Sequence, residues 1–483
     1  MEKACEPAYF HSVRLDYDRC RGCTNCIKRC PTEAIRVRDG KARILEERCI
    51  DCGECIRVCP NHAKLAVTDP LARLKDFRFA VALPAPSFYA QFKPAVPAET
   101  FLRALLALGF DDIFEVPLAA EAVSLAIRHY LRTHPRPRPL VSSACPAVVR
   151  LMQVRFPALL HHIVPIESPM EIAARLAKAK ISRETGLPAR EIGCFFISPC
   201  PAKVTVAKQP VGSRGPSAVD GVLSMSDVVG AVLSHLAELT PGRRPAQEVA
   251  GATKAVDPGW PRASGLGIGW GRSGGENLAI GEGLLLAVDG IHNVISVLTE
   301  VEKGRLSDVD YIEAQACIGG CIGGALTTEN PYVARVRLRQ RAAAAGSVFK
   351  VDNEEVEDLI RQGLFELPEP IQPRPVLALD QDVVQALRKL ELLEETVKRL
   401  PGLDCGACGS PNCRALAEDI ARGAAVETDC IFLLREKVQV LASEMVLLAQ
   451  KLPPAMGQPL PGDSRPAHPA NEVGKASPST GGA

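Results

Sequence analysis

Short apolar runs alternate with helix-like stretches through the middle of this chain. Between the runs, stretches such as "PAETFLRALLALG" (97–109) and residues 119–132 repeat apolar side chains at helical spacing. Strands that alternate with helices form largely parallel sheets. The pattern therefore predicts an α/β core, which we place at residues 71–370. The strand-like runs are "FRFAVAL" (77–83), "DDIFEVPL" (111–118), "RPLVSSACP" (138–146) and "EIGCFFISPCP" (191–201).

The remaining segments show other patterns. Residues 241–276 are rich in Pro and Gly and predict a long loop. A helical pattern at 380–400 predicts a linker helix within 371–400. Residues 431–452 have apolar positions near helical spacing, which predicts an amphipathic helix. The Pro-, Gly- and Ser-rich tail, 453–483, predicts disorder.

Composition narrows the class of protein. The chain has 483 residues, 47% hydrophobic and 23% charged, with a formal net charge of +1. This is enough core for several domains, and the charge gives no reason to expect a nucleic-acid or membrane partner. The sequence has no apolar run long enough to span a bilayer and no signal-peptide core, so we expect a cytoplasmic protein. Thiols stay reduced there, and 18 cysteines then indicate metal binding.

Two cysteines fall outside any spacing pattern. Cys194, in the apolar "GCFFIS", predicts a buried core thiol. Cys5 stays unassigned.

The N-terminal motifs "CRGCTNCIKRCP" and "CIDCGECIRVCP" are two copies of C-x2-C-x2-C-x3-C-P. In this pattern three thiolates of one copy and the fourth of the other hold each 4Fe–4S cluster. Zinc is the weaker alternative, because its sites do not interlock in this way. Residues 13–65 resemble a bacterial two-cluster ferredoxin, which implies a small α+β domain (1–70) that relays electrons. The expected ligand sets are Cys20, Cys23, Cys26 and Cys59, and Cys49, Cys52, Cys55 and Cys30.

Four further cysteines lie in "SSACP" (142–146), "SPCPAK" (198–203) and "EAQACIGGCIGG" (313–324), and two of them, Cys145 and Cys200, stand at apparent strand ends beside proline. Ligands gather at the carboxyl ends of strands in α/β folds. Cys145, Cys200, Cys317 and Cys321 are therefore candidates to hold one cubane cluster. A buried structural role is the alternative for any one of them.

These three segments, in this order, resemble the signature motifs of the iron–iron hydrogenases. With the ferredoxin-like domain, the resemblance covers about residues 10–370. It implies a two-lobed core with an H-cluster between the lobes: a 4Fe–4S cube joined to a two-iron unit with CO, cyanide and dithiolate ligands. Cys145, Cys200 and Cys317 would hold the cube and Cys321 would bridge to the two-iron unit. The glycines around Cys317 and Cys321 would leave room for that group.

Other positions match the family's pocket. Lys203 lies where the family's lysine binds a cyanide, and "PAPSF" (84–88) resembles the segment whose Pro and Ser meet the other cyanide, here Pro86 and Ser87. A surface lysine and a turn proline are the alternatives. The family's usual methionines are replaced by Ser198 and Gln315.

The chain departs from the family along its proton route. Ala144 replaces a proton-carrying cysteine. Glu121 matches one relay glutamate, but Ser124 replaces the other and Val164 replaces a relay serine. Proton transfer needs groups in hydrogen-bond reach, so we expect slow turnover. The pattern resembles sensory-type hydrogenases, although a route through water or through His161 and His162 stays open.

The C-terminal "LPGLDCGACGSPNCRALAEDIARGAAVETDC" (400–430) has the spacing C-x2-C-x4-C-x16-C. It resembles a small helical four-cysteine iron–sulfur domain of sensory-type hydrogenases and corrinoid-protein subunits, here 401–452. Zinc is again the weaker alternative. The expected ligands of its 4Fe–4S cluster are Cys405, Cys408, Cys413 and Cys430. We expect the helix that follows to pack on its own cluster domain; a homodimer or a signalling partner is the alternative.

Three functions are consistent with these patterns. The favoured one is a slow, sensory hydrogenase-like protein that binds H2 and passes electrons through its clusters. The second is an efficient ferredoxin-linked hydrogenase, and the third a non-catalytic hydrogenase-like assembly or electron-transfer protein. The implied partners are H2, protons, a ferredoxin or other redox protein, and the enzymes that mature an H-cluster.

Overall fold

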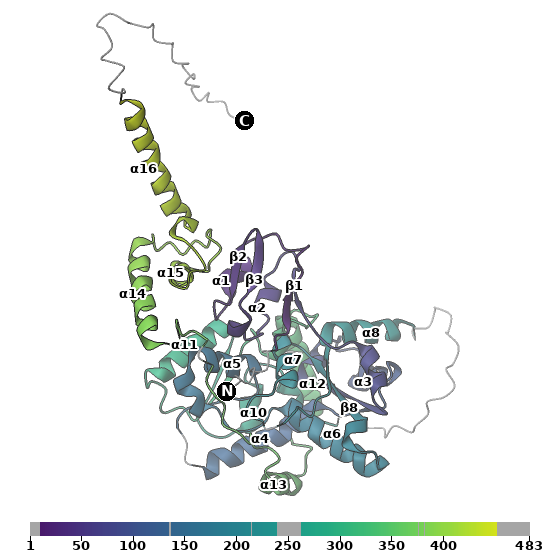
Figure 1. The fold of residues 1–483 in the computed structure, drawn as a ribbon. Coiled ribbons are helices and arrows are strands. Elements are labelled where there is room, and N and C mark those ends of the chain that lie inside the picture. The colour runs from purple at the N-terminus through teal and green to yellow at the C-terminus, as the bar shows by residue number, and fades with distance from the viewer. Residues whose placement is uncertain are drawn as a thin grey trace, which may run out of the picture. The chain divides into compact units, whose positions relative to one another are not determined.

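The computed structural model describes residues 10–134, 137–213, 215–238, 262–374, 376–380 and 382–451 (Figure 1). The chain divides into two compact units, Met1–Ala425 and Val426–Ala483. Cys5 and the tail expected to be disordered lie outside the described residues. Within those residues, no helix has the length and apolar character needed to cross a membrane.

The N-terminal region is a small α+β structure. Its strands pair antiparallel, β1 with β4 and β2 with β3, and two short helices carry motif cysteines. Val13, Ile27 and Ile35 form its small core together with cysteine side chains. The elements are β1 (Val13–Leu15), α1 (Asn25–Arg29), β2 (Ile35–Arg38), β3 (Lys41–Ile44), α2 (Glu54–Arg57) and β4 (Lys64–Ala66).

A four-stranded parallel sheet in the order β6-β5-β8-β9 forms one half of the core. All seven residues of β8 are buried, as expected of a central parallel strand. Helix α6 packs on β5 and β8, and α8 on β8 and β9. The elements are β5 (Phe79–Pro84), α3 (Ala98–Ala107), β6 (Asp112–Ile113), α4 (Val116–Thr133), α6 (Pro169–Thr185), β8 (Ile192–Ser198), β9 (Gly221–Ser224) and α8 (Met225–Glu238).

A three-stranded parallel sheet in the order β10-β11-β7 forms the other half. The α/β core with parallel sheets, predicted from the alternating pattern, is therefore confirmed. The strands and flanking helices are β7 (Leu140–Val141), α5 (Pro146–Arg155), α7 (Pro201–Lys208), β10 (Leu285–Asp289), α11 (Ile291–Glu302), β11 (Tyr311–Gln315), α12 (Pro331–Ala345) and α13 (Asn353–Arg361).

The prediction of a loop over 241–276 is wrong at its C-terminal end. Residues 262–276 contain α9 (Gly265–Gly269) and the start of α10 (Gly275–Ile280), and residues 241–261 lie outside the described part. Glycine lowers helix propensity, but here it allows close packing. A Cβ on Gly265 would lie 1.9 Å from the carbonyl oxygen of Ala342, and one on Gly267 would lie 2.3 Å from that of Pro117.

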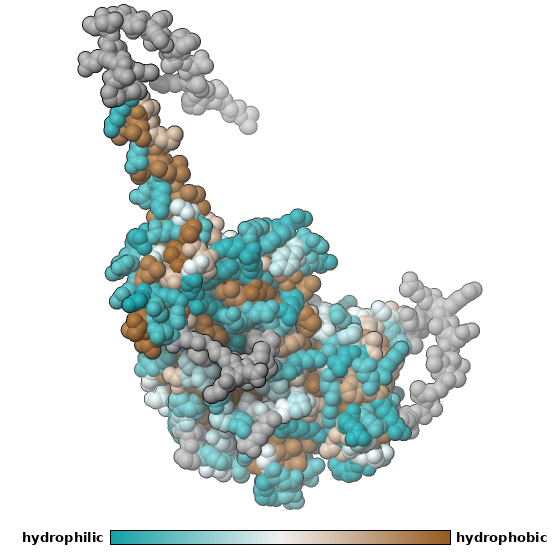
Figure 2. Space-filling view, in the orientation of Figure 1, coloured by the Kyte–Doolittle hydropathy of each residue, from teal (hydrophilic) through white to brown (hydrophobic). Residues whose placement is uncertain are grey.

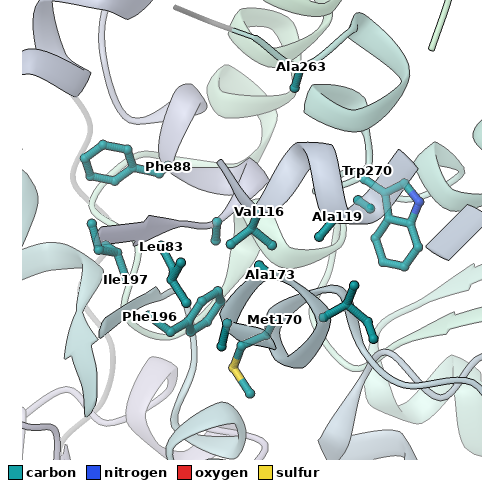
Figure 3. Packing of buried hydrophobic residues seen from close by; sticks show 14 of the residues in the cluster. Leu83, Phe88, Val116, Ala119, Met170, Ala173, Phe196, Ile197, Ala263 and Trp270 are labelled. Atoms are coloured by element: carbon teal, nitrogen blue, oxygen red, sulfur yellow. The ribbon is translucent and has the colours of Figure 1, made fainter. Parts of the chain in front are cut away.

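The largest hydrophobic cluster fills the space around the four-stranded sheet (Figure 3). Leu83 and Ile197 come from the strands, Val116 and Met170 from α4 and α6, and Trp270 from the segment after α9. Cys194, in β8, is fully buried in this cluster, which confirms the predicted core thiol.

Three helices follow the core. In the first unit, α14 (Val383–Arg399) packs on α15 (Cys413–Ala421). In the second unit, α16 (Ile431–Ala449) follows directly after Cys430. The helices expected at 380–400 and 431–452 are thus present.

Candidate metal centre

Cys145 and Cys200 lie beyond strand ends, as the sequence predicted. Cys145 caps the N-terminus of α5, just after β7, and Cys200 caps α7, just after β8. Cys317 follows β11, and Cys321 begins a single 3-10 turn. A helix N-terminus stabilises a thiolate, so two of these positions favour ligand chemistry.

Electrostatics place these thiols around one site. Burial raises the pKa of Cys145, Cys200 and Cys321, and the negative charges of the neighbouring cysteines raise it further. The value for Cys200 is about 12. Thiols with such pKa values ionise at neutral pH when a metal replaces the proton.

The spacing of ligand atoms argues against single zinc ions. Sulfurs on one zinc lie about 4 Å apart, since each Zn–S bond is about 2.3 Å. Among the described residues, the one group of three or more Cys, His, Asp or Glu ligand atoms all within 4.8 Å of one another is His11, Cys49 and Asp51. The motif cysteines are farther apart, as a larger cluster requires.

A small cavity, with a volume of about 40 Å³, lies beside Cys145 and Cys321. Its walls come from the ends of strands in both sheets, so it lies between the two halves of the core. Apolar side chains dominate the lining. The lining residues are Ala85, Pro86, Val116, Ser142, Ala144, Cys145, Pro169, Met170, Phe196, Pro199, Lys203, Trp270, Gly271, Glu276, Ala314, Gln315 and Cys321.

Several polar groups at this cavity lack full partners. Lys203 is 8% exposed, and its ammonium donates to the Ala144 carbonyl at 3.3 Å, the one hydrogen bond that this group makes to a described residue. Gln315 Oε1, in this cavity, is buried with no hydrogen-bond partner among the described residues, and so is Ser87 Oγ, which follows the lining residue Pro86 in the chain. Buried polar atoms are normally paired. The cavity thus fits a bound group that carries both negative charge and polar atoms.

Ser198 has a structural contact instead. Its hydroxyl donates to the carbonyl of Cys200 at 2.8 Å and accepts from the Cys200 amide at 3.2 Å. These two bonds shape the turn that carries the cysteine into the site.

The glycines next to Cys317 and Cys321 were expected to leave room for the metal group, but in the structure they face other parts of the protein. A Cβ on Gly320 would lie 2.2 Å from Gln315 Oε1, and one on Gly324 would lie 2.2 Å from the Pro199 carbonyl oxygen. Gly320 also has a φ of +92°, where a side chain is strained. The space that these two glycines leave is filled by protein, so they allow the cysteine segments to pack together.

Among the positions compared with the family's proton route, Ala144 lines the cavity, but Glu121, Ser124 and Val164 do not. Glu121 is fully buried, and its carboxylate accepts hydrogen bonds from the amides of Ser264 and Lys350, both at 2.6 Å. Ser124 accepts from the Trp270 indole at 2.9 Å. Val164 is buried in the core, and His161 and His162 are absent from the cavity lining.

Sequence reasoning missed a carboxylate in this cavity. Glu276 is 1% exposed and accepts hydrogen bonds from Tyr311 at 2.6 Å and from Ser142 at 2.9 Å. Burial raises its pKa to about 7, against the lowering effect of these two hydroxyls and of Lys203. Burial and the charge of Glu276 also raise the pKa of Glu313. Glu276 lies in a Gly-rich stretch with no periodicity, so no signal in the sequence marked it.

Several N-terminal cysteines act on one another's pKa values, and the two ligand sets stay a prediction. Burial first, and then the charges of neighbouring cysteines, raise the pKa values of these thiols. The charge of Cys30 raises the pKa values of Cys49, Cys52 and Cys55. The charges of Cys20 and Cys23 raise the pKa of Cys26. Cys59 accepts a hydrogen bond from the Ala63 amide.

The N-terminal region contacts the cysteine segments of the core directly. Ser12 Oγ donates to the carbonyl of Pro201, next to Cys200, at 2.9 Å. Arg57 donates to the carbonyl of Gly323 at 2.9 Å. A Cβ on Gly53 would lie 2.7 Å from that of Ala325. The Cys52–Cys55 motif therefore lies against the core segments that carry Cys200 and Cys321.

The cysteine-rich segment after α14 packs on strand β2 of the N-terminal region. Asp419 accepts from Arg36 at 2.6 Å and from Arg38 at 3.0 Å, and the amide of Val37 donates to the Gly409 carbonyl at 2.7 Å. These buried ion pairs fix the segment that carries Cys405, Cys408 and Cys413. Cys430 belongs to the second unit.

Three family models match the chain. The iron only hydrogenase large subunit, C-terminal domain, matches residues 78–257 and 277–325. A 4Fe-4S dicluster domain matches residues 12–60, and an Fe-S cluster family matches residues 400–432.

Relatives agree with these matches. The chain is 25% identical over 366 residues to the periplasmic Fe hydrogenase large subunit of Nitratidesulfovibrio vulgaris, covering 66% of this chain and 87% of that protein. It is 31% identical over 113 residues to a cytosolic Fe-S cluster assembly factor of Aspergillus clavatus, covering 23% of this chain and 17% of that one. An apo iron–iron hydrogenase structure from Chlamydomonas reinhardtii aligns with a TM-score of 0.46 and 17% identity, covering 63% of this chain and 98% of that one. These matches identify residues 78–257 and 277–325 as a domain of the iron–iron hydrogenase family, with a dicluster ferredoxin region before it and an iron–sulfur region after it.

Proposed function

We propose that this protein binds H2 at an H-cluster and interconverts it slowly with protons and electrons, as a hydrogen sensor or regulator. The observation that carries the proposal is the cavity between the two sheets. Cys145, Cys321, an almost fully buried lysine and a buried polar atom without a partner, that of Gln315, all line this one cavity. A structural metal site would not need such a space.

The chain's own residues would hold the group as follows. Cys145, Cys200 and Cys317 would bind the cube, and Cys321 would be shared with the two-iron unit. When bound, this group supplies the metal chemistry that splits H2. Lys203 and Ser87 would bind its cyanide ligands, beside Pro86, and Gln315 would contact the same unit.

Glu276 is the best placed group to move protons. It lies in the cavity lining with Ala144, the position that lacks a thiol. A carboxyl with a pKa of about 7 exchanges protons readily at neutral pH, and the Tyr311 and Ser142 hydroxyls orient it. This supports a proton route through Glu276, with Glu121 as a structural carboxylate.

Electrons would leave through the N-terminal clusters. The contacts of Gly53 and Arg57 with the core support transfer between the cluster of Cys49, Cys52, Cys55 and Cys30 and the H-cluster. The second N-terminal cluster and the one held by Cys405, Cys408, Cys413 and Cys430 would pass electrons to a ferredoxin or another redox protein. We place the protein in the cytoplasm, where reduced thiols and maturation enzymes are available.

Ala144 supports slow turnover and a sensory role, because the cavity lacks the thiol at the position that faces it. A specific observation favours a second candidate, a non-catalytic assembly or electron-transfer protein: the likeness to the fungal assembly factor. The unpartnered atoms of Ser87 and Gln315 weigh against it, since they suit a ligand that such a protein would lack.

Infrared spectroscopy of anaerobically matured protein, with and without H2, separates these functions. The proposal predicts bands from CO and cyanide ligands that shift when H2 is added. An absence of such bands in protein loaded with iron would favour the non-catalytic candidate. Fast H2 turnover alongside the bands would favour an efficient hydrogenase and contradict the sensory role.

A further inference from the structure

Helix α16 carries an exposed row of apolar side chains. The row repeats at alternating intervals of three and four residues along the whole helix. Its members are between 44% and 70% exposed, and Figure 2 shows hydrophobic residues on the surface of this helix. They are Ile431, Leu434, Val438, Leu441, Met445 and Leu448.

This spacing is characteristic of a seam between two helices. A repeat that averages 3.5 residues keeps one apolar stripe in contact with a partner helix that coils around it. An isolated helix of this length is only marginally stable in water, and exposed apolar side chains gain from burial.

The charged residues beside the stripe favour one way of pairing two copies of α16 over the other. If two copies of α16 pack antiparallel, Ile431 lies opposite Leu448, Leu434 opposite Met445 and Val438 opposite Leu441. In the same alignment Lys437 of each copy lies beside Glu444 of the other, which makes two ion pairs. A parallel pair would place Lys437 beside Ala442 and form neither ion pair.

We propose that α16 forms an antiparallel two-helix coiled coil with α16 of a second copy of this chain. The stripe is complementary to itself in this arrangement, in both its apolar layers and its charges.

Sedimentation equilibrium of the purified full-length protein, over a range of micromolar concentrations, tests the proposal. The expected result is a dimer. L441D places a charge at the centre of the seam and should weaken the dimer at least about tenfold. The matched control is S443D, which puts the same charge on the opposite side of the helix and should leave the dimer unchanged.

A charge exchange tests the orientation without disturbing the core of the seam. E444K alone would bring two lysines together twice in each dimer and should weaken it, whereas K437E/E444K should restore it. E444K also leaves intact the ion pair between Lys437 and Glu427, at 3.6 Å.

Three results would overturn the proposal. One is a wild-type protein that stays monomeric, as expected if α16 binds a different protein. Another is a dimer that L441D does not weaken. The third is an assembly of four chains, or a dimer in which the double charge exchange fails to restore association.

Discussion

The Tyr311 hydroxyl donates a 2.6 Å hydrogen bond to Oε1 of Glu276, in the lining of the cavity that Ala144 and Lys203 also line. Tyr311 begins β11, and Glu276 lies in the first turn of α10. The fold thus places an orienting hydroxyl and a titratable carboxyl at the point where the expected thiol is missing.

Replacing Glu276 with Gln should slow proton exchange. A glutamine keeps the shape and hydrogen-bonding capacity of the side chain but cannot carry a proton, and loss of a positioned acid–base group typically costs about 10²-fold or more. The measurement is isotope exchange between D2 and water by matured protein, with infrared spectra to show that the cofactor is intact. The control is E121Q. A large loss in E121Q with none in E276Q would place the route along α4 instead.

Restoring the missing thiol should speed turnover. If proton delivery at position 144 limits the rate, A144C adds a group that can pass protons into the cavity. H2 oxidation with an artificial electron acceptor measures the gain. A85C is a matched control, because Ala85 lines the same cavity. An intact cofactor with no gain in A144C, or an equal gain in A85C, would show that delivery at this position is not limiting.

Glu276 should make stability depend on pH. Its pKa is raised in the folded protein, so folding favours the protonated form. Its stabilising contribution is present below the unfolded pKa of about 4.5 and is lost as pH rises toward 7. Chemical denaturation of unmatured protein should therefore show a fall in unfolding free energy from pH 5 to pH 8. We expect E276Q to reduce this fall by about 1–3 kcal/mol.

The control for this pH dependence is E282Q, which alters an exposed carboxylate that pairs with Arg132. It should leave the slope of stability against pH as in the wild type. If the wild type and E276Q show the same slope of unfolding free energy against pH, the pKa of Glu276 is not raised by folding and the prediction is wrong.

Ligand cysteines and the core cysteine should respond differently to substitution. C26A should remove about one cluster's worth of iron, about four atoms, and the corresponding visible absorption. C194A is the control, because Cys194 is a fully buried thiol in the core. It should lower stability slightly and leave the iron content unchanged. Equal iron loss in both variants would mean that the loss reflects misfolding.

Local patterns were enough to predict much of the architecture. The alternation of strands and helices predicted the parallel α/β core because side-chain periodicity reflects which face of each element is buried. Strand ends marked the positions of Cys145 and Cys200, because ligands gather at the carboxyl ends of parallel strands in α/β folds. The segment 262–276 was expected to be a loop, because its glycines hide the helices that close packing with Ala342 and Pro117 stabilises.

At the site, too, some features follow from the sequence alone and others only from the tertiary structure. The sequence by itself determined the cysteine spacing, the absence of a thiol at Ala144 and the apolar repeat of α16, because each is a relation between neighbours along one chain. Tertiary structure decided that Glu276 meets Tyr311 and Ser142 in the cavity, and that Glu121 is instead held by the amides of Ser264 and Lys350. These residues are far apart in sequence, and a buried carboxyl's pKa and role depend on which distant groups folding brings to it.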